Sequence, residues 1–380
     1  MNILITGTKG FVGKNLVESL KNIRDGKDKT RGELKIDEIY EYDIESDISE
    51  LDEYCKKAEF IFHLAGVNRP QNESEFMAGN FGFTSVLLGK LKEYGNKAPV
   101  LISSSIQAEL DNPYGKSKKA GEDLMFTYGE ENGVKVLVYR YPNVFGKWCR
   151  PNYNSAVATF CNNIANDLPI TVNDRSHMMT LVYVDDVVNE CINALCGKEN
   201  RDGKFCSVPV VHKITLGEIA DLLYSYKESR KNLSVPDMSD EFSKNLYATY
   251  LSYLPENEFS YPLKMNVDDR GSFTEIIRTN DRGQFSVNIS KPHITKGNHW
   301  HHTKNEKFLV VSGKGVIRFR KPDSDKVIEY FVSGDKLEVV DIPTGYTHNI
   351  ENLGDTDMVT FMWANEAFNP EKPDTYFLEV

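Results

Sequence analysis

Residues 1–13, MNILITGTKGFVG, join a short apolar run to a glycine-rich turn and then to the start of an amphipathic stretch. Further apolar runs follow, each succeeded by a helical pattern, at residues 38–43, 59–66, 99–105 and 135–143. Buried strands that alternate with helices are typical of a parallel sheet covered by helices on both faces. The sequence therefore predicts an α/β domain over residues 1–250.

The character of the chain changes after residue 254. Short strand patterns now alternate with turns rich in glycine and asparagine, at residues 273–279, 283–291, 307–320, 326–334, 336–343 and 357–363. Many short strands at even spacing indicate an antiparallel sandwich or jelly roll. We expect this all-β domain to span residues 255–380, which gives the 380-residue chain two domains.

The composition limits the partners and the location of the protein. Lysine and arginine number 45 against 56 aspartates and glutamates, and the resulting net charge of −11 repels nucleic acid. No apolar run reaches the roughly 18 residues of a membrane span, and the N-terminus shows no leader pattern. The cysteines lack CxxC spacing and are expected to be reduced. We expect a cytoplasmic protein that binds neither nucleic acid nor membrane.

The glycine-rich turn predicts a dinucleotide site. Gly7, Gly10 and Gly13 lie between a strand and a helix that opens with Phe11 and Val12. At such a turn the helix N-terminus can hold a pyrophosphate. The alternative is a turn that only packs the helix on the strand.

Tyr114 and Lys118 favour the dinucleotide interpretation. Pro113 can begin a helix, and a spacing of four places both side chains on one helix face. A nearby ammonium lowers the pKa of a phenol, so Tyr114 could give its proton to an alkoxide as hydride reaches carbon. The serines at 103–105 end a predicted strand at the edge of the sheet where ligands bind. A surface tyrosine beside a solvated lysine is the alternative.

In these motifs the chain resembles the extended short-chain dehydrogenase/reductases, which have a Rossmann-type sheet. The resemblance rests on the glycine-rich turn, the serine, YxxxK, RYPNVFG at 140–146 and VYVDDV at 182–187. It implies that Ser105 orients a carbonyl, Tyr114 donates a proton and Lys118 holds the nicotinamide ribose. Ser104 is the second candidate for the serine. The loop HLAG adds three expected cofactor contacts, at Leu64, Ala65 and Gly66.

Two further residues near this site, Asp43 and His63, each allow more than one interpretation. Asp43 ends the second predicted strand, where an acidic residue favours a free ribose 2′-hydroxyl. We expect NADPH as the cofactor, and Asp43 leaves NADH open. His63 closes an apolar strand and is interpreted as a hydrogen-bonded core residue.

A second constellation lies in the all-β domain: His299, His301, Glu306 and His348. Residues two apart on a strand share a face, and a returning strand can bring the last histidine opposite. Three imidazoles and a carboxylate suit a divalent metal, zinc first among them. A histidine-rich loop without metal is the alternative. His293 and His302 fall outside the pattern.

These two half-sites resemble the cupin motifs, and residues 268–273 and 284–301 resemble deoxysugar epimerases of that superfamily. In those enzymes the histidine matching His299 is the base and no metal is needed, so the base here stays open. Lys296 matches a cationic substrate contact. Other candidates for the base are Tyr346, Lys304 and Lys307.

The order of the two domains resembles bifunctional enzymes of capsular polysaccharide and lipopolysaccharide synthesis. The resemblance implies a homodimer that epimerises C3 of a UDP-linked 4-keto-6-deoxy-2-acetamido sugar. Reduction at C4 then gives UDP-2-acetamido-2,6-dideoxy-L-talose, which leads to N-acetyl-L-fucosamine. Expected substrate contacts are Asn143, Arg150 and Lys296, with Asn152 and Tyr153 as further candidates in a segment that could equally be a surface loop.

Two rival functions follow from the same residues. In the first, the reductase works and the cupin only binds sugar or forms the dimer. In the second, the protein senses the dinucleotide without turnover, although the intact Ser105, Tyr114 and Lys118 argue against that hypothesis.

Overall fold

The computed structural model describes residues 1–380 and divides into two compact units. Unit 1 comprises Met1–Tyr224 and Met238–Pro255, and unit 2 comprises Ser225–Asp237 and Glu256–Val380. The predicted boundary at residues 250–255 misses one feature of this division. Residues 225–237 precede that boundary but pack with unit 2. The backbone N–H of Arg278 donates to the carbonyl of Leu233 at 2.8 Å, which ties this segment to unit 2.

Unit 1 is built on a seven-stranded sheet in which β1 to β5 run parallel. In spatial order its strands are β2 (Glu38–Tyr42), β1 (Asn2–Thr6), β3 (Phe60–His63), β4 (Val100–Ser105), β5 (Val136–Tyr141), β9 (Phe205–Cys206) and β8 (Arg201–Asp202). The predicted α/β domain is confirmed.

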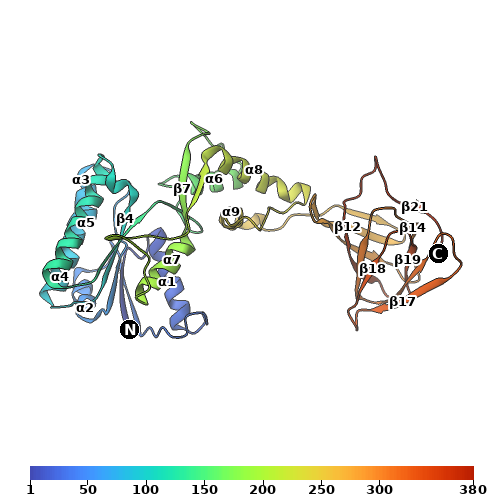
Figure 1. The fold of residues 1–380 in the computed structure, drawn as a ribbon, viewed down its shortest axis with the longest axis horizontal. Coiled ribbons are helices and arrows are strands. Elements are labelled where there is room, and N and C mark those ends of the chain that lie inside the picture. Colours follow the sequence, from blue (N-terminus) through green and yellow to red (C-terminus); the bar gives the residue numbers. More distant parts are fainter. The chain divides into compact units, whose positions relative to one another are not determined.

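Helices cover both faces of this sheet (Figure 1). Along β1, Ile3 and Ile5 belong to a core shared with α1 (Phe11–Arg24) and α7 (Val184–Leu195). Leu4 points to the opposite core, because successive side chains of a strand alternate. That second core lies against α2 (Ile48–Lys57), α4 (Phe83–Glu93) and α5 (Pro113–Asn132).

The remaining elements of unit 1 flank the main sheet. A small sheet joins β10 (His212–Thr215), β7 (Met178–Tyr183) and β6 (Asn143–Phe145). The helical elements are α3 (Ser74–Phe76), the π-helix η1 (Met77–Gly82), the 3₁₀-helix η2 (Ile106–Glu109), α6 (Ala156–Ala165), α9 (Glu241–Leu251) and the first half of α8 (Leu216–Asn232), whose residues from 225 onward belong to unit 2. None of the helices has both the length and the apolar character to span a bilayer.

Unit 2 is the predicted sandwich of two antiparallel sheets. One contains β11 (Met265–Asp268), β12 (Gly271–Thr279), β13 (Gly283–Ser290), β20 (Met358–Ala364), β15 (Glu306–Ser312) and β18 (Val339–Ile342). The other contains β17 (Val327–Ser333), β16 (Lys314–Arg320), β19 (Thr347–Asn352), β14 (Thr295–Trp300) and β21 (Tyr376–Phe377). A short 3₁₀-helix, η3 (Glu256–Glu258), precedes them. Apolar side chains from both sheets form the core.

Candidate functional site

The turn between β1 and α1 has the backbone shape of a dinucleotide site. Gly7 has a φ of +78°, and a Cβ there would lie 2.6 Å from the backbone nitrogen of Ala65. A Cβ on Gly13 would lie 2.0 Å from the carbonyl oxygen of Gly7. Helix α1 begins without a side-chain cap, so the N–H groups of its first turn are open to an anion. The backbone therefore fits a pyrophosphate.

The turn and the loop after β3 bring together the residues predicted to contact the cofactor: Gly7, Gly10, Phe11, Val12, Gly13, Leu64, Ala65 and Gly66. Asp43 follows β2 beside the turn. Its carboxylate accepts the backbone N–H groups of Lys9 at 2.7 Å and Ile44 at 2.8 Å. The side chain thus ties the end of β2 to the turn, and its contact with a ribose stays a prediction.

Ser105, Tyr114 and Lys118 meet at the carboxyl end of β4. Ser105 is the last residue of that strand, and the other two lie one turn apart at the start of α5. The Ser105 hydroxyl lies close enough to the Tyr114 phenol to act on its pKa. The Lys118 ammonium lies 5.9 Å from the centre of the Tyr114 ring and donates to the carbonyl of Ser103 at 3.1 Å. The structure thus assembles the three predicted side chains in one place.

Burial dominates the electrostatics of this group. It raises the pKa of Tyr114, and the interaction with Ser105 opposes the rise. The predicted lowering of this pKa by Lys118 is not seen, because the pKa is raised by burial and the opposing interaction comes from Ser105 and not from the lysine. Burial also lowers the pKa of Lys118 to about 8, and the negative charge of Glu122 opposes that shift.

Ser104 faces away from the site. Its hydroxyl donates to the buried Glu122 carboxylate at 2.6 Å. Arg140 binds the same carboxylate with two nitrogens, at 2.8 and 2.7 Å. Since alternate residues of a strand face opposite sides, this network leaves Ser105 as the serine beside the tyrosine.

Asn80 belongs to the site but was not predicted. It lies in the π-helix η1, an irregularity often found at functional sites. Its amide nitrogen donates to the carbonyl of Val67 at 3.0 Å and to the Ser117 hydroxyl at 2.9 Å. A Cβ on Gly66 would lie 2.7 Å from its side-chain oxygen. Asn80 therefore fixes the loop after β3 against α5. No pattern in the sequence distinguishes this asparagine from others.

His63 is a core residue, as expected. Its ring nitrogens lie 2.8 Å from the hydroxyls of Thr6 and Thr84. Burial lowers its pKa to about 3, so the ring stays neutral.

The expected sugar-nucleotide contacts lie in the segments around β6. The Asn143 side chain donates to the carbonyl of Thr180 at 3.4 Å. The Arg150 guanidinium lies 5.2 Å from the ring centre of Tyr153. Arg69 donates to the carbonyls of Asn152 and Tyr153, at 3.2 and 2.6 Å. Their contacts with substrate stay predictions.

In unit 2 the four predicted metal ligands converge: His299, His301, Glu306 and His348. One ligand atom from each lies within 4.8 Å of the others. Across β14 and β19, His299 pairs directly with His348. His293 and His302 lie outside the cluster, beside Asp355 and Trp300 respectively.

The cluster has the unmet bonding capacity that a cation would satisfy. The Nε2 atoms of His301 and His348 and one oxygen of Glu306 are buried without a hydrogen-bond partner. Burial disfavours ionisation of Glu306, but its interactions with the two histidines outweigh burial and hold its pKa below the usual range. Burial, with the neighbouring histidines, lowers the pKa of His299 to about 4. Neutral imidazoles and a carboxylate are the donors that zinc requires.

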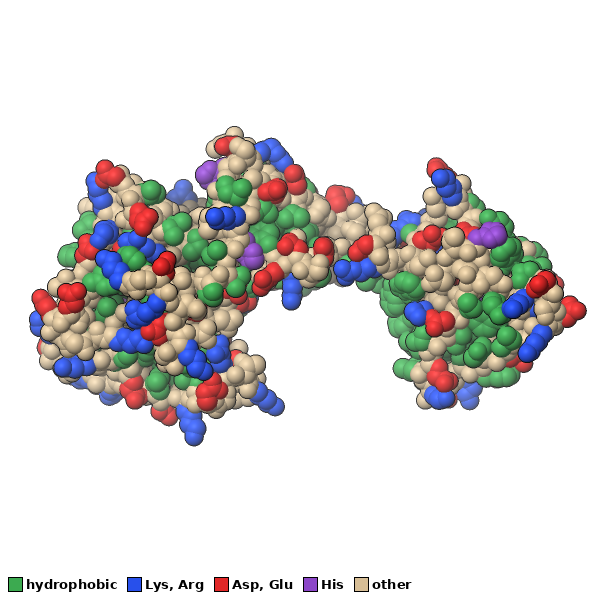
Figure 2. Space-filling view, in the orientation of Figure 1, with side chains coloured by type: hydrophobic (Ala, Val, Ile, Leu, Met, Phe, Trp, Pro, Cys, Tyr) green, Lys and Arg blue, Asp and Glu red, His purple; other side chains and the backbone are tan.

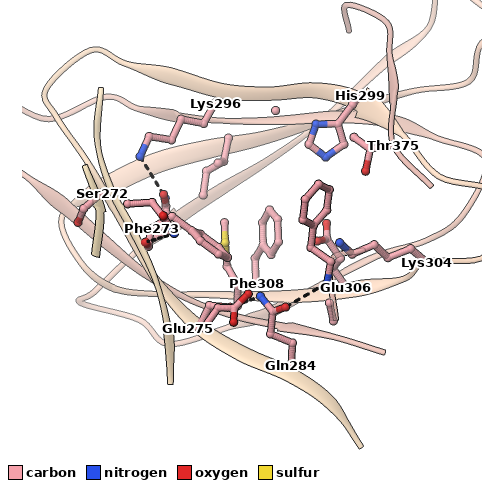
Figure 3. Close-up of a pocket in the computed structure, with 18 of the residues that line it drawn as sticks. Ser272, Phe273, Glu275, Gln284, Lys296, His299, Lys304, Glu306, Phe308 and Thr375 are labelled. Carbon is pink, nitrogen blue, oxygen red and sulfur yellow. Dashed lines mark hydrogen bonds between the residues drawn. The ribbon is translucent and has the colours of Figure 1, made fainter. Parts of the chain in front are cut away.

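The cluster faces a cavity of about 1060 Å³ inside the sandwich. Figure 3 shows Lys296 and His299 on one side of the cavity and Glu275 and Gln284 on the other. The Lys296 ammonium donates to the Asn288 side chain at 2.9 Å. Of the other candidates for the base, Lys304 lines the cavity, whereas Tyr346 and Lys307 do not. The cavity is large enough for a small-molecule ligand.

Comparisons with known proteins agree with this architecture. Residues 3–204 match the NAD dependent epimerase/dehydratase family, and residues 266–376 match the polysaccharide biosynthesis C-terminal domain. A Pseudomonas aeruginosa protein named UDP-2-acetamido-2,6-beta-L-arabino-hexul-4-ose reductase is 44% identical over 380 residues, covering 100% of this chain and 99% of that protein.

Solved structures give the same result. The capsular polysaccharide assembling protein CapF from Staphylococcus aureus has a TM-score of 0.92 and 58% identity over 100% of both chains. A UDP-glucuronic acid 4-epimerase from Bacillus cereus shares the fold of unit 1, with a TM-score of 0.52 and 20% identity over 67% of this chain and 98% of that one. The chain therefore belongs to the NAD dependent epimerase/dehydratase family, with a polysaccharide biosynthesis C-terminal domain joined to it.

Proposed function

We propose that this chain is a bifunctional nucleotide-sugar enzyme. Unit 2 epimerises C3 of a UDP-linked 4-keto-6-deoxy-2-acetamido-hexose, and unit 1 reduces the C4 ketone with NADPH or NADH to UDP-2-acetamido-2,6-dideoxy-L-talose. The observation that carries the proposal is the presence in one chain of the Ser105–Tyr114–Lys118 group beside a dinucleotide turn and of a buried histidine–glutamate cluster facing a cavity. The full-length relatives named for a keto-sugar reductase and for capsule assembly support it.

The reductase residues provide positioning and a proton. NADPH, when bound, supplies the hydride that adds to C4. The Ser105 hydroxyl binds the carbonyl oxygen, and Tyr114 gives its phenolic proton to that oxygen as the C=O bond becomes C–OH. The Lys118 ammonium stabilises the negative charge left on the phenol, because opposite charges attract strongly in a buried site.

The epimerase uses the same ketone differently. The C4 carbonyl acidifies the C3–H bond, so that a base can remove the proton and a second proton can return on the opposite face. His299, His301, Glu306 and His348 would hold a divalent metal, and this set of ligands favours zinc. The positive charge of the metal would stabilise the oxyanion that develops on the substrate. Lys296 and Lys304 are the cavity residues from which the base is to be identified, because the lone pair of His299 is assigned to the metal.

The two reactions have a fixed order under this proposal. Reduction removes the carbonyl that acidifies C3, so inversion has to come first. The product of unit 2 is therefore the substrate of unit 1, and it leads toward N-acetyl-L-fucosamine in capsule or O-antigen.

The homodimer, which is expected under either hypothesis, has one observation in its favour. Figure 2 shows hydrophobic side chains gathered on the visible face of unit 2, in the region of β17 and β18. The exposed apolar side chains there are Val327, Ile328, Tyr330, Phe331 and Val339. Exposed apolar faces of this kind often mark interfaces, and they support a homodimer under either hypothesis.

The reductase part is tested by mixing the protein with the UDP-keto-sugar and either NADPH or NADH. Oxidation of the cofactor, followed by absorbance, is the expected result, and the ratio of the two rates gives the preference. Tight cofactor binding without oxidation would contradict the reductase and favour a dinucleotide sensor.

A further inference from the structure

The metal ligand His301 is oriented by a residue far along the chain. The Nδ1–H of its buried ring donates to the backbone carbonyl of Asp374. A carbonyl oxygen can only accept, so Nδ1 carries the proton and Nε2 keeps its lone pair. That Nε2 lies 3.7 Å from Glu306 Oε2 and has no hydrogen-bond partner. The Asp374 carbonyl thus selects the tautomer in which His301 can bind a cation.

The side chain of the same residue holds the loop between two ligands. The Asp374 carboxylate accepts the backbone N–H groups of His302 at 2.9 Å, Thr303 at 2.7 Å and Lys304 at 2.9 Å, and the Thr303 hydroxyl at 3.0 Å. Successive N–H groups that converge on one anion form a rigid concave loop. This loop joins His301 to Glu306, so its shape sets the spacing of both ligands.

The chain after Asp374 is attached to the other two ligand strands. Phe377 of β21 pairs with His299 of β14. The backbone N–H of Leu378 donates to Asn298 at 3.0 Å, and its carbonyl accepts the hydroxyl of Thr347. Residues 374–378 therefore connect to the segments that carry all four ligands.

We propose that Asp374 is a positioning residue of the metal site. It acts through His301 and the loop 302–304, and it makes no contact of its own with the cation. The inference rests on the metal-binding part of the proposed function. Partners of ligating histidines typically change metal affinity about 10- to 100-fold when they are removed.

The test uses the full chain and the variant Asp374→Ala. Zinc affinity is measured by competition with a chromophoric chelator, and the coordination geometry by the absorption spectrum of the cobalt(II)-loaded protein. Asp374→Ala keeps the backbone carbonyl that accepts from His301 and removes the carboxylate that holds residues 302–304. Because the loop between His301 and Glu306 then loses its fixed shape, we expect zinc affinity about 10- to 100-fold weaker than wild type, with an altered cobalt spectrum. The control is Asp357→Ala, which removes an exposed carboxylate of unit 2 that binds Lys291, at 2.9 Å, and none of the four predicted metal ligands. The control should leave affinity and spectrum unchanged.

Metal-free protein is also unfolded thermally, to separate positioning from general destabilisation. If Asp374→Ala does not fold, Asp374→Asn replaces it, since the amide keeps one acceptor oxygen but loses the charge. Unchanged zinc affinity in a folded Asp374 variant would overturn the inference while leaving the metal site intact. A wild-type protein that binds no zinc would instead overturn the metal-binding part of the proposed function.

Discussion

Tyr114 is the residue on which the proposed reduction depends most directly. Tyr114→Phe removes only the hydroxyl and keeps the aromatic ring, whose centre lies 5.6 Å from the ring centre of Phe76. We expect kcat for cofactor oxidation to fall about 100- to 10,000-fold, the usual contribution of a general acid. Proton exchange at C3 should continue. The control Tyr94→Phe, which removes a hydroxyl bound to Asp52 on helix α2, should retain both activities. Loss of both in Tyr114→Phe would contradict two separate sites.

Lys118 should give the reduction its pH dependence. Its ammonium has a pKa of about 8 because burial disfavours the charged form, with Glu122 opposing. The charged form prevails below that pKa, so kcat/KM should decline as the pH rises through about 8. Glu122→Gln removes the opposing charge, lowers the pKa further and moves the decline to lower pH.

The matched control for this shift is Glu130→Gln, at an exposed position of the same helix. Its pH profile should coincide with that of the wild type. Coincident profiles for all three proteins would refute the role of Glu122, provided that each is folded at the temperature of the assay.

At the scale of residues, spacing was sufficient to predict only the side chains that the proposed reactions use directly. The four-residue spacing of Tyr114 and Lys118 and the two half-sites of the metal cluster are visible in the sequence. Asn80, Glu122 and Asp374 are not, because they act through hydrogen bonds to distant backbone or side-chain atoms. Such partners become identifiable only when the fold brings them together.

The turn between β1 and α1 makes the clearest prediction for a structural element. In Gly13→Ala the added Cβ would lie 2.0 Å from the carbonyl oxygen of Gly7, so the turn has to open. We expect NADPH affinity to fall at least about tenfold, because the N–H groups that face the pyrophosphate are displaced. Calorimetric titration measures this change.

The control is Gly89→Ala, in helix α4, where a Cβ would meet nothing within 4 Å. It should bind NADPH as the wild type does and gain slightly in stability, because alanine favours helices over glycine by about 1 kcal/mol. Equal NADPH affinity in Gly13→Ala would show that the cofactor binds elsewhere.

The elements themselves were largely predictable, and the exceptions have physical reasons. The alternation of apolar runs with helical patterns correctly predicted β1 to β5, since buried parallel strands are apolar throughout. Strand periodicity placed His299 and His301 on one face, but it did not show the register shift between Gly297 and His299. Asn298 there has a φ of +56°, a local conformation that a pattern of alternate residues does not encode. The packing of residues 225–237 with unit 2 is likewise a tertiary property.

At the scale of the whole molecule, we propose that the two sites act on the same C4 ketone in two different ways. Under the proposed function, unit 2 uses the ketone to acidify the neighbouring C3–H bond, and unit 1 uses the same ketone as the acceptor of hydride. The two activities should therefore be separable by substitution and by cofactor, while the substrate stays the same.

The most direct measurement is deuterium incorporation during incubation of the full chain with the UDP-keto-sugar in heavy water, without NADPH or NADH. We expect deuterium at C3, its loss after treatment with a chelator, and its return when zinc is added. A protein that oxidises NADPH with this sugar but leaves C3 unlabelled under every one of these conditions would contradict the account.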